Sequence, residues 1–327
     1  MKILYAVQAT GNGHISRAME LLPYLEEYGE VDIFLSGSNS TLKLDAPVKY
    51  RSKGMSLHYT CNGELNYYKT VVGCSLRRAY KEAVQLPVEK YDLILNDFEA
   101  ITSIACNKKK VPMIHFGHQA SFVSDNTPRP DKKSYLGEWI LKNYVKSSHN
   151  VGLHFDAYDD FIFPPVIKKE VWDAEPTNKG HITVYLPSFC DQELVQIFSK
   201  IEGAHFEIFS RQIQQITPHG NIKLIPVDKM LFNESLITCN GIITGAGFET
   251  PAEALYLRKK IIAIPIGGQY EQICNGAALA KLGALVLDKL EGNFPRRVEN
   301  WLEGSTQSPV IKFQSTRGIV HRVMDVF

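Results

Sequence analysis

A histidine stands at the start of the helix that the sequence predicts after its first strand. It is His14 in Gly11-Asn12-Gly13-His14, directly after the apolar run Lys2–Gln8. The helix dipole disfavours a protonated imidazole at this end and favours the neutral ring, which can accept a proton. The pattern therefore indicates a general base, although a polar first-turn residue without a catalytic role has the same appearance.

Two carboxylates follow another apolar strand of the same half. Asp97 comes directly after the strand Tyr91–Asn96 and precedes a helical pattern. It is either the N-cap of that helix or the partner that orients the ring of His14 through a hydrogen bond. Glu99 competes with Asp97 for either role.

Further polar side chains, His115, His118 and Gln119, close the strand Val111–Phe116. At the carboxyl end of a strand they are placed to line an acceptor pocket. Three histidines and Asp97 raise the alternative of a metal site. Neither their spacing nor an Asp-x-Asp sequence after a strand supports that alternative. We therefore expect no metal and no cofactor.

The segment Gly241–Asn275 places three binding features after consecutive strands. The small residues Gly245–Gly247 let a ligand approach the backbone at the start of a helix, whose free N–H groups bind anions. Glu253 follows early in that helix and could accept hydrogen bonds from two vicinal hydroxyls, as a ribose presents. The loop Pro265–Gln272 is dense in side chains that can bind sugar hydroxyls. Each feature alone has a structural explanation, whereas the set predicts a phosphate, ribose and sugar site.

This segment resembles the donor site of the GT-B glycosyltransferases. It is similar to that of the UDP-glycosyltransferases and of the peptidoglycan N-acetylglucosaminyltransferase of lipid II synthesis. In those enzymes Gly-x-Gly-x-x-Thr-x-x-Glu-Ala-Leu and a later Pro, Gln-x-Glu-Gln and Asn bind a UDP-sugar. The matching residues are Gly245, Gly247, Thr250, Glu253, Ala254, Leu255, Pro265, Gln269, Glu271, Gln272 and Asn275. Lys259-Lys260 and Gly276 depart from the pattern and leave the donor sugar open.

The resemblance extends to the first half of the chain. Many UDP-glycosyltransferases begin with a strand, Gly-x-Gly-His and a helix, and their histidine is the general base, which His14 matches. The resemblance also implies donor contacts at Ser188, Val227, Met230, Ala246 and Phe248. On the acceptor side we expect Gly11, Asn12, Gly13, Glu99, His118 and Gln119.

The elements that must position these residues alternate between strand and helix. The strands expected are Lys2–Gln8, Val31–Ser36, Tyr91–Asn96, Val111–Phe116, Val151–Phe155, His181–Leu186, Ala204–Phe209, Asn221–Val227, Gly241–Thr244, Lys260–Ile266 and Ala284–Leu287. Strands that are apolar along their length are typical of parallel sheets covered by helices on both faces. We expect an α/β protein with the GT-B fold, two doubly wound Rossmann-like domains facing a cleft.

The domain boundaries follow from one irregular segment. Residues 164–180 contain three prolines and no period, which is typical of a linker. We expect an acceptor-binding domain over residues 1–163 and a donor-binding domain over 181–327. The final helix, Ser315–Val326, is expected to return to the first domain, as in the relatives.

The composition of the chain is typical of a globular protein. The 327 residues, 44% hydrophobic and 22% charged, suit two globular domains, and a net charge of +1 gives no overall attraction to nucleic acid. Cysteines without a CxxC pair, and the lack of a signal peptide or a long apolar run, indicate a cytoplasmic protein. The segment Lys133–Lys146 mixes aromatic residues with lysines. It is either an amphipathic helix packed on the core or a docking face for the inner surface of a membrane.

The expected function is inverting, metal-independent transfer of a hexose or N-acetylhexosamine from a UDP-sugar. The acceptor is a hydroxyl of a glycan, a lipid-linked sugar or a small molecule, and the resemblance suggests cell-envelope or glycolipid biosynthesis. A UDP-sugar 2-epimerase shares the fold and would need a carboxylate-rich cleft. A non-catalytic donor-binding subunit that needs a partner chain is the other alternative.

Overall fold

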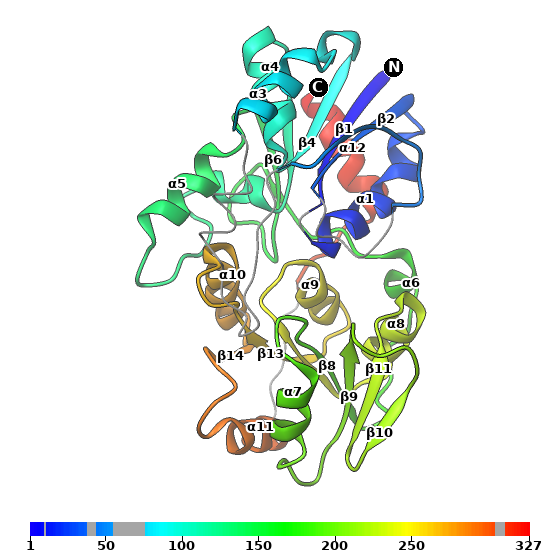
Figure 1. Ribbon diagram of the computed structural model, residues 1–327, viewed down its shortest axis with the longest axis vertical. Coiled ribbons are helices and arrows are strands. Elements are labelled where there is room, and N and C mark those ends of the chain that lie inside the picture. Colours follow the sequence, from blue (N-terminus) through cyan, green and yellow to red (C-terminus); the bar gives the residue numbers. More distant parts are fainter. Residues whose placement is uncertain (10, 38–43, 55–75, 305–310) are drawn as a thin grey trace.

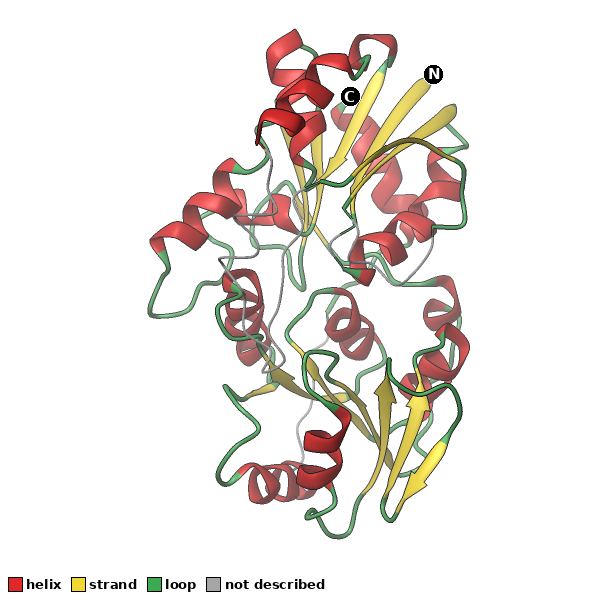
Figure 2. Cartoon of the chain, in the orientation of Figure 1, coloured by secondary structure: helices red, strands yellow, loops and turns green. Residues whose placement is uncertain are grey.

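The computed structural model describes residues 1–327 except 10, 38–43, 55–75 and 305–310. The described chain forms two α/β domains, each built on its own sheet (Figure 1). Helices cover both faces of each sheet (Figure 2). Within the described ranges, none of the helices has the length and apolar composition needed to cross a bilayer.

The first sheet has the strand order β3-β2-β1-β4-β5-β6-β7, and its neighbouring strands run parallel. Its strands are β1 (Lys2–Gln8), β2 (Glu30–Ser36), β3 (Val48–Ser52), β4 (Leu93–Asp97), β5 (Ile114–Gly117), β6 (His149–Leu153) and β7 (Ile162–Phe163). Its helices are α1 (Asn12–Leu25), α3 (Leu76–Gln85), η1 (Val88–Lys90), α4 (Ala100–Lys109), η2 (Gln119–Val123) and α5 (Tyr135–Asn143). The central strand β4 is buried throughout, as its apolar sequence requires.

The second sheet has the order β10-β11-β9-β8-β12-β13-β14, which resembles the first apart from the added edge strand β10. Its strands are β8 (His181–Tyr185), β9 (His205–Ser210), β10 (Thr217–His219), β11 (Ile222–Pro226), β12 (Gly241–Gly245), β13 (Lys260–Ile264) and β14 (Leu285–Val286). Its helices are α7 (Asp191–Phe198), α8 (Lys229–Thr238), α9 (Glu249–Tyr256), α10 (Tyr270–Lys281) and α11 (Phe294–Glu303). Only the edge pair β10–β11 is antiparallel among the described pairs.

Each sheet reverses its strand order at the centre, between β1 and β4 in the first and between β8 and β12 in the second. Ligands of doubly wound proteins bind outside the carboxyl ends of the strands at such a reversal. The arrowheads of the parallel strands of both sheets point toward the junction between the domains, and the antiparallel edge strand β10 points away from it (Figure 2). The two reversal points therefore face each other across that junction.

The chain crosses between the domains twice. Residues 164–180 make the first crossing and contain the short helix α6 (Lys169–Trp172), which the sequence did not predict. After the second domain the chain returns, and α12 (Thr316–Val326) packs on α1 (Figure 1). Ile319, Val320 and Val323 of α12 are fully buried in the largest apolar cluster. That cluster also contains side chains of the second domain, so the two domains share packed apolar surface.

Candidate functional site

The ring of His14 lies against a buried carboxylate. His14 is in the first turn of α1 and keeps a small exposed fraction, whereas Asp97, the last residue of β4, is fully buried. His14 Nδ1 is 2.9 Å from Asp97 Oδ1. With the ring proton on Nδ1, His14 donates to Asp97 and leaves Nε2 free to accept a proton. The geometry is that of a base held by a carboxylate.

Arg17 completes a buried cluster that sequence reasoning missed. Its guanidinium donates to Asp97 through Nε at 3.2 Å and through Nη2 at 2.7 and 2.9 Å. Burial alone would raise the pKa of Asp97, but the charges of Arg17 and His14 outweigh burial and hold it well below its usual range. Asp97 is thus a permanent anion at the base of the site. The signal for Arg17 was its position one turn after His14 on the same helix.

Glu249, in the first turn of α9, carries the cluster into the second domain. Arg17 Nη1 donates to Glu249 Oε1 in a close ion pair. Burial raises the pKa of Glu249 to about 7, although the charge of Arg17 opposes the shift. Gly13 permits this approach, because a Cβ there would lie 3.2 Å from Glu249 Cγ. The loop after β1 and the start of α9 are therefore in direct contact.

Glu99 is a helix cap, and its expected contact with the acceptor stays a prediction. Its carboxylate accepts from the backbone N–H groups of Ile101 at 2.9 Å and Thr102 at 2.6 Å, so Glu99, and not Asp97, is the N-cap of α4. The side chain is buried, with both oxygens engaged. Glu99 is also excluded as the partner of His14, because Asp97 fills that place.

His118 and Asn275 join the two domains, and the expected contacts of His118 with the acceptor and of Asn275 with the donor stay predictions. His118 is 0% exposed, and its ring contacts Leu153 O at 3.0 Å and Asn275 Oδ1 at 2.8 Å. Asn275 is also 0% exposed and donates through Nδ2 to Ala246 O at 3.0 Å. The ring of Phe248 stacks on His118 with centroids 3.9 Å apart. These side chains belong to the packed junction, where their polar groups contact protein partners.

Gln119 is also buried rather than placed along an open acceptor pocket. It begins the short helix η2 beneath the surface of the first domain. Gly11 and Asn12 are partly exposed at the start of α1, beside Gly13. Of the expected acceptor residues, only Gly11, Asn12 and Gly13 lie at the edge of the junction.

Glu253 is covered in this arrangement. Its carboxylate is 2% exposed and lies 3.0 Å from Lys168 Nζ. Lys168 is in the linker, directly before α6. Burial raises the pKa of Glu253, and the charge of Lys168 opposes that shift. A ribose could reach this carboxylate only after Lys168 moves away.

The remaining expected donor residues divide by exposure. Ala246 and Phe248 are buried, so only their backbone could meet a ligand. The partly exposed ones around the carboxyl ends of the second sheet are Ser188, Val227, Gly245, Gly247, Thr250, Gln269, Glu271 and Gln272. Met230 is largely exposed at the start of α8. Gln272 accepts from the N–H of Ile266 at 3.0 Å and so also shapes its loop.

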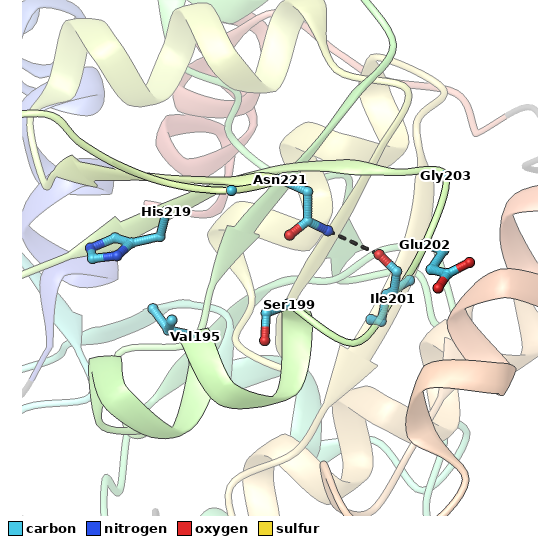
Figure 3. Close-up of a pocket in the computed structure, with 8 residues that line it drawn as sticks. Val195, Ser199, Ile201, Glu202, Gly203, His219 and Asn221 are labelled. Carbon is cyan, nitrogen blue, oxygen red and sulfur yellow. Dashed lines mark hydrogen bonds between the residues drawn. The ribbon is translucent and has the colours of Figure 1, made fainter.

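A surface hollow on the second domain lies elsewhere. It is lined by Val195, Ser199, Ile201, Glu202, Gly203, His219, Gly220 and Asn221 (Figure 3). The loops that contribute Ile201 and Asn221 precede β9 and β11, at the amino ends of these strands. Asn221 Nδ2 donates to Ile201 O at 2.9 Å and ties the two loops together. The hollow is therefore at the opposite edge of the sheet from the cluster around Arg17.

The junction thus combines a base with an anion-binding helix end. His14 approaches from the first domain, and the first turn of α9, with the small residues Gly245–Gly247 before it, approaches from the second. Free N–H groups at such a helix start stabilise negative charge. Among the residues described, no group of three or more His, Cys, Asp or Glu side chains could hold a metal ion.

Comparison with known proteins identifies the class. The family model described as glycosyl transferase family 1 matches residues 1–303. No curated protein sequence matches.

Solved structures share the whole architecture. UGT89C1 from Arabidopsis thaliana complexed with UDP aligns with a TM-score of 0.61 at 13% identity, over 99% of this chain and 94% of that chain. MurG from Acinetobacter baumannii aligns with a TM-score of 0.57 at 14% identity, over 99% of both chains. The glycosyltransferase SnogD from Streptomyces nogalater aligns with a TM-score of 0.57 at 15% identity, over 100% of this chain and 99% of that chain. These similarities confirm the GT-B fold expected from the sequence.

The structural role of Asn275 gives a first prediction. Asn275→Ala should leave buried partners unsatisfied and lower the free energy of unfolding by about 1–3 kcal/mol. The matched control is Glu271→Ala in the same helix, whose side chain is partly exposed and whose loss should change stability by less than about 0.5 kcal/mol. Thermal unfolding of both variants checks this. Equal stability of Asn275→Ala and the unmodified chain would contradict the assignment.

Proposed function

The chain belongs to glycosyl transferase family 1, and we propose that it transfers a hexose or N-acetylhexosamine from a UDP-sugar to an acceptor hydroxyl. The transfer inverts the anomeric carbon and uses neither a metal ion nor a cofactor. The observation that carries the proposal is the contact between His14 and Asp97 at 2.9 Å, opposite the start of α9. It supplies a base and an anion-binding helix end on either side of one junction.

The donor binds on the second domain. Its diphosphate lies at the start of α9, where Gly245 and Gly247 leave room beside the backbone. Gln269 and Glu271, both partly exposed, bind the sugar, and Glu253 binds the ribose once Lys168 has withdrawn. Solved structures of the neighbour UGT89C1 with UDP and with UDP-L-rhamnose support a nucleotide-sugar donor.

The reaction is a single displacement. His14 Nε2 takes the proton of the acceptor hydroxyl while its oxygen attacks the anomeric carbon from the face opposite UDP. The bond between that carbon and the phosphate oxygen breaks, and the N–H groups of α9 stabilise the charge that develops on UDP. Asp97 holds the ring by its Nδ1–H and stabilises the imidazolium. The proposed chemistry needs no Lewis acid, because a helix end meets the leaving charge.

A UDP-sugar 2-epimerase is the second candidate, because three carboxylates gather at the junction. They are Asp97 and Glu253, which are buried, and Glu249, which is partly exposed. Each is paired with Arg17 or Lys168, which favours a structural or binding role over proton transfer at the sugar. Incubation with UDP-N-acetylglucosamine alone separates the two functions, since only an epimerase yields a sugar epimer without an acceptor.

We also propose that α5 docks on an anionic membrane surface. Its apolar side chains face solvent, with Tyr135 93%, Leu136 60%, Trp139 62% and Ile140 38% exposed. Leu141 is the one residue of α5 that is buried, so the helix does not place its aromatic face on the core. Lys132 and Lys133 are exposed just before it. Aromatic side chains beside lysines suit an interfacial helix at a negatively charged bilayer.

Removal of the base gives the second prediction. His14→Ala should lower turnover by about 10²–10⁴-fold, the usual contribution of a positioned general base. UDP affinity should stay nearly unchanged, because the donor lies on the other domain. Assays with a panel of acceptors, repeated in EDTA, measure both base dependence and metal independence. Unmodified turnover of His14→Ala would show that the base lies elsewhere, and loss of activity in EDTA would exclude the metal-free reaction.

Membrane docking gives the third prediction. The full chain should float with vesicles of phosphatidylserine and phosphatidylcholine at low salt. The triple variant Tyr135→Ser, Leu136→Ser, Trp139→Ser should stay with the free protein. Ile216→Ser, which removes an exposed apolar side chain of the second domain, is the control and should float. If the unmodified chain does not float with the vesicles, α5 does not bind an anionic membrane.

A further inference from the structure

The start of α9 already holds a negative charge that comes from the chain itself. Glu249 is in the first turn of this helix, and its carboxylate binds the guanidinium of Arg17 from the first domain. An arginine beside the start of a helix is an arrangement in which proteins bind phosphate. The Glu249 carboxylate therefore occupies the guanidinium that a phosphate bound there would use.

The groups around Glu249 leave little room for a second anion. Arg17 and His14 face it from α1, Asp97 faces it from the end of β4, and Glu253 lies one turn later in α9. The charge of Lys168, from the linker, also acts on Glu249. Tyr5 of β1 lies beside Arg17 as a neutral phenol, because burial raises its pKa well above the usual value. The single cation Arg17 thus contacts two anions, Asp97 and Glu249. A diphosphate placed here would be repelled by Glu249 unless that carboxylate moved or took up a proton.

The two carboxylates are held very differently. Asp97 makes its contacts to Arg17 and His14 within one domain and is fully buried. Within the described part of the chain Glu249 forms one ion pair, across the junction, and its side chain keeps 14% exposure. Burial raises the pKa of Glu249 to about 7 in spite of Arg17, so a proton is readily gained near neutral pH. Glu249 is the member of the cluster that can be released.

We infer that Glu249 is an internal competitor of the donor diphosphate, and that Arg17 passes from the Glu249 carboxylate to a phosphate oxygen when the donor binds. This inference rests on the proposed function and adds a regulation of its donor site. Without donor, the ion pair closes the junction and neutralises Arg17. With donor, Glu249 is displaced, takes up a proton from solvent and leaves Arg17 beside the leaving diphosphate.

A carboxylate elsewhere in the junction provides a matched control. Glu138 of α5 accepts from Tyr270 OH of the second domain at 2.7 Å and from Arg129 Nε at 2.6 Å. It therefore also joins the two domains, but it contacts α10 and not the start of α9. Glu138→Gln removes a carboxylate from the junction without changing the charge beside the proposed phosphate.

Calorimetry with UDP tests the inference without requiring turnover. Glu249→Gln should bind UDP about tenfold tighter than the unmodified chain, because one like charge is removed. Glu138→Gln should not gain affinity, and Arg17→Lys should lose it. Titration near pH 7.5 in buffers of different ionisation enthalpy should show proton uptake in the unmodified chain and none in Glu249→Gln.

The outcomes separate this inference from the proposed function. Tight UDP binding with equal affinity and equal proton uptake in the unmodified chain and in Glu249→Gln would overturn the role of Glu249 and leave the transferase proposal standing. Tighter binding of both Glu249→Gln and Glu138→Gln would assign the effect to loosening of the junction and would also overturn it. Absence of UDP binding in every chain would instead contradict the proposed donor.

Discussion

The buried guanidinium of Arg17 sets the arrangement of the whole junction. A fully buried cation is strongly unfavourable unless anions and hydrogen-bond acceptors surround it. Asp97 from its own domain supplies part of that surrounding, and Glu249 from the other domain supplies the rest. The position of His14 follows, because the same carboxylate of Asp97 binds Arg17 and the imidazole. One charge thus fixes the base and holds the two domains in contact.

Close packing supports this ion pair on either side. Gly13 lets the first helix approach Glu249, and Gly137 of α5 has the ring of Tyr270 where a Cβ would stand, with ring atoms 2.4 Å away. Between them, His118 stacks on Phe248 and contacts Asn275. Several side chains that a sequence motif associates with ligands therefore serve the closed junction. The groups that remain accessible, Gln269 and Glu271 among them, lie at the rim.

The fold and the local chemistry could be predicted from the sequence, because both depend on near neighbours along the chain. Apolar runs such as Lys2–Gln8 are strands in the structure, and the position of His14 at a helix start is as expected. The edge strand β3 was missed because its sequence, VKYRS, is half polar and its residues are partly exposed. The two-residue strand β7 is too short to give a pattern. The identity of the cap of α4 was left open, since Asp97 and Glu99 both fit the sequence signal and only packing decides between them.

The pairings across the junction could not be predicted, since they join residues without any sequence relation. Arg17 and Glu249 are 232 positions apart, and His118 and Asn275 are 157 apart. No period or motif connects such pairs, and a histidine that lines a pocket has the same sequence signature as one that stacks on a phenylalanine. The covering of Glu253 by Lys168 has the same origin, because it depends on where the linker lies.

Hydrogen–deuterium exchange with and without UDP tests the central claim most directly. The claim places the donor at the start of α9, facing His14. The account predicts that UDP slows exchange of backbone N–H groups over residues 245–252 and 266–272 and leaves the loops before β9 and β11 unchanged. Protection confined to those loops, around Ile201 and Asn221, or to the first domain alone, would contradict it.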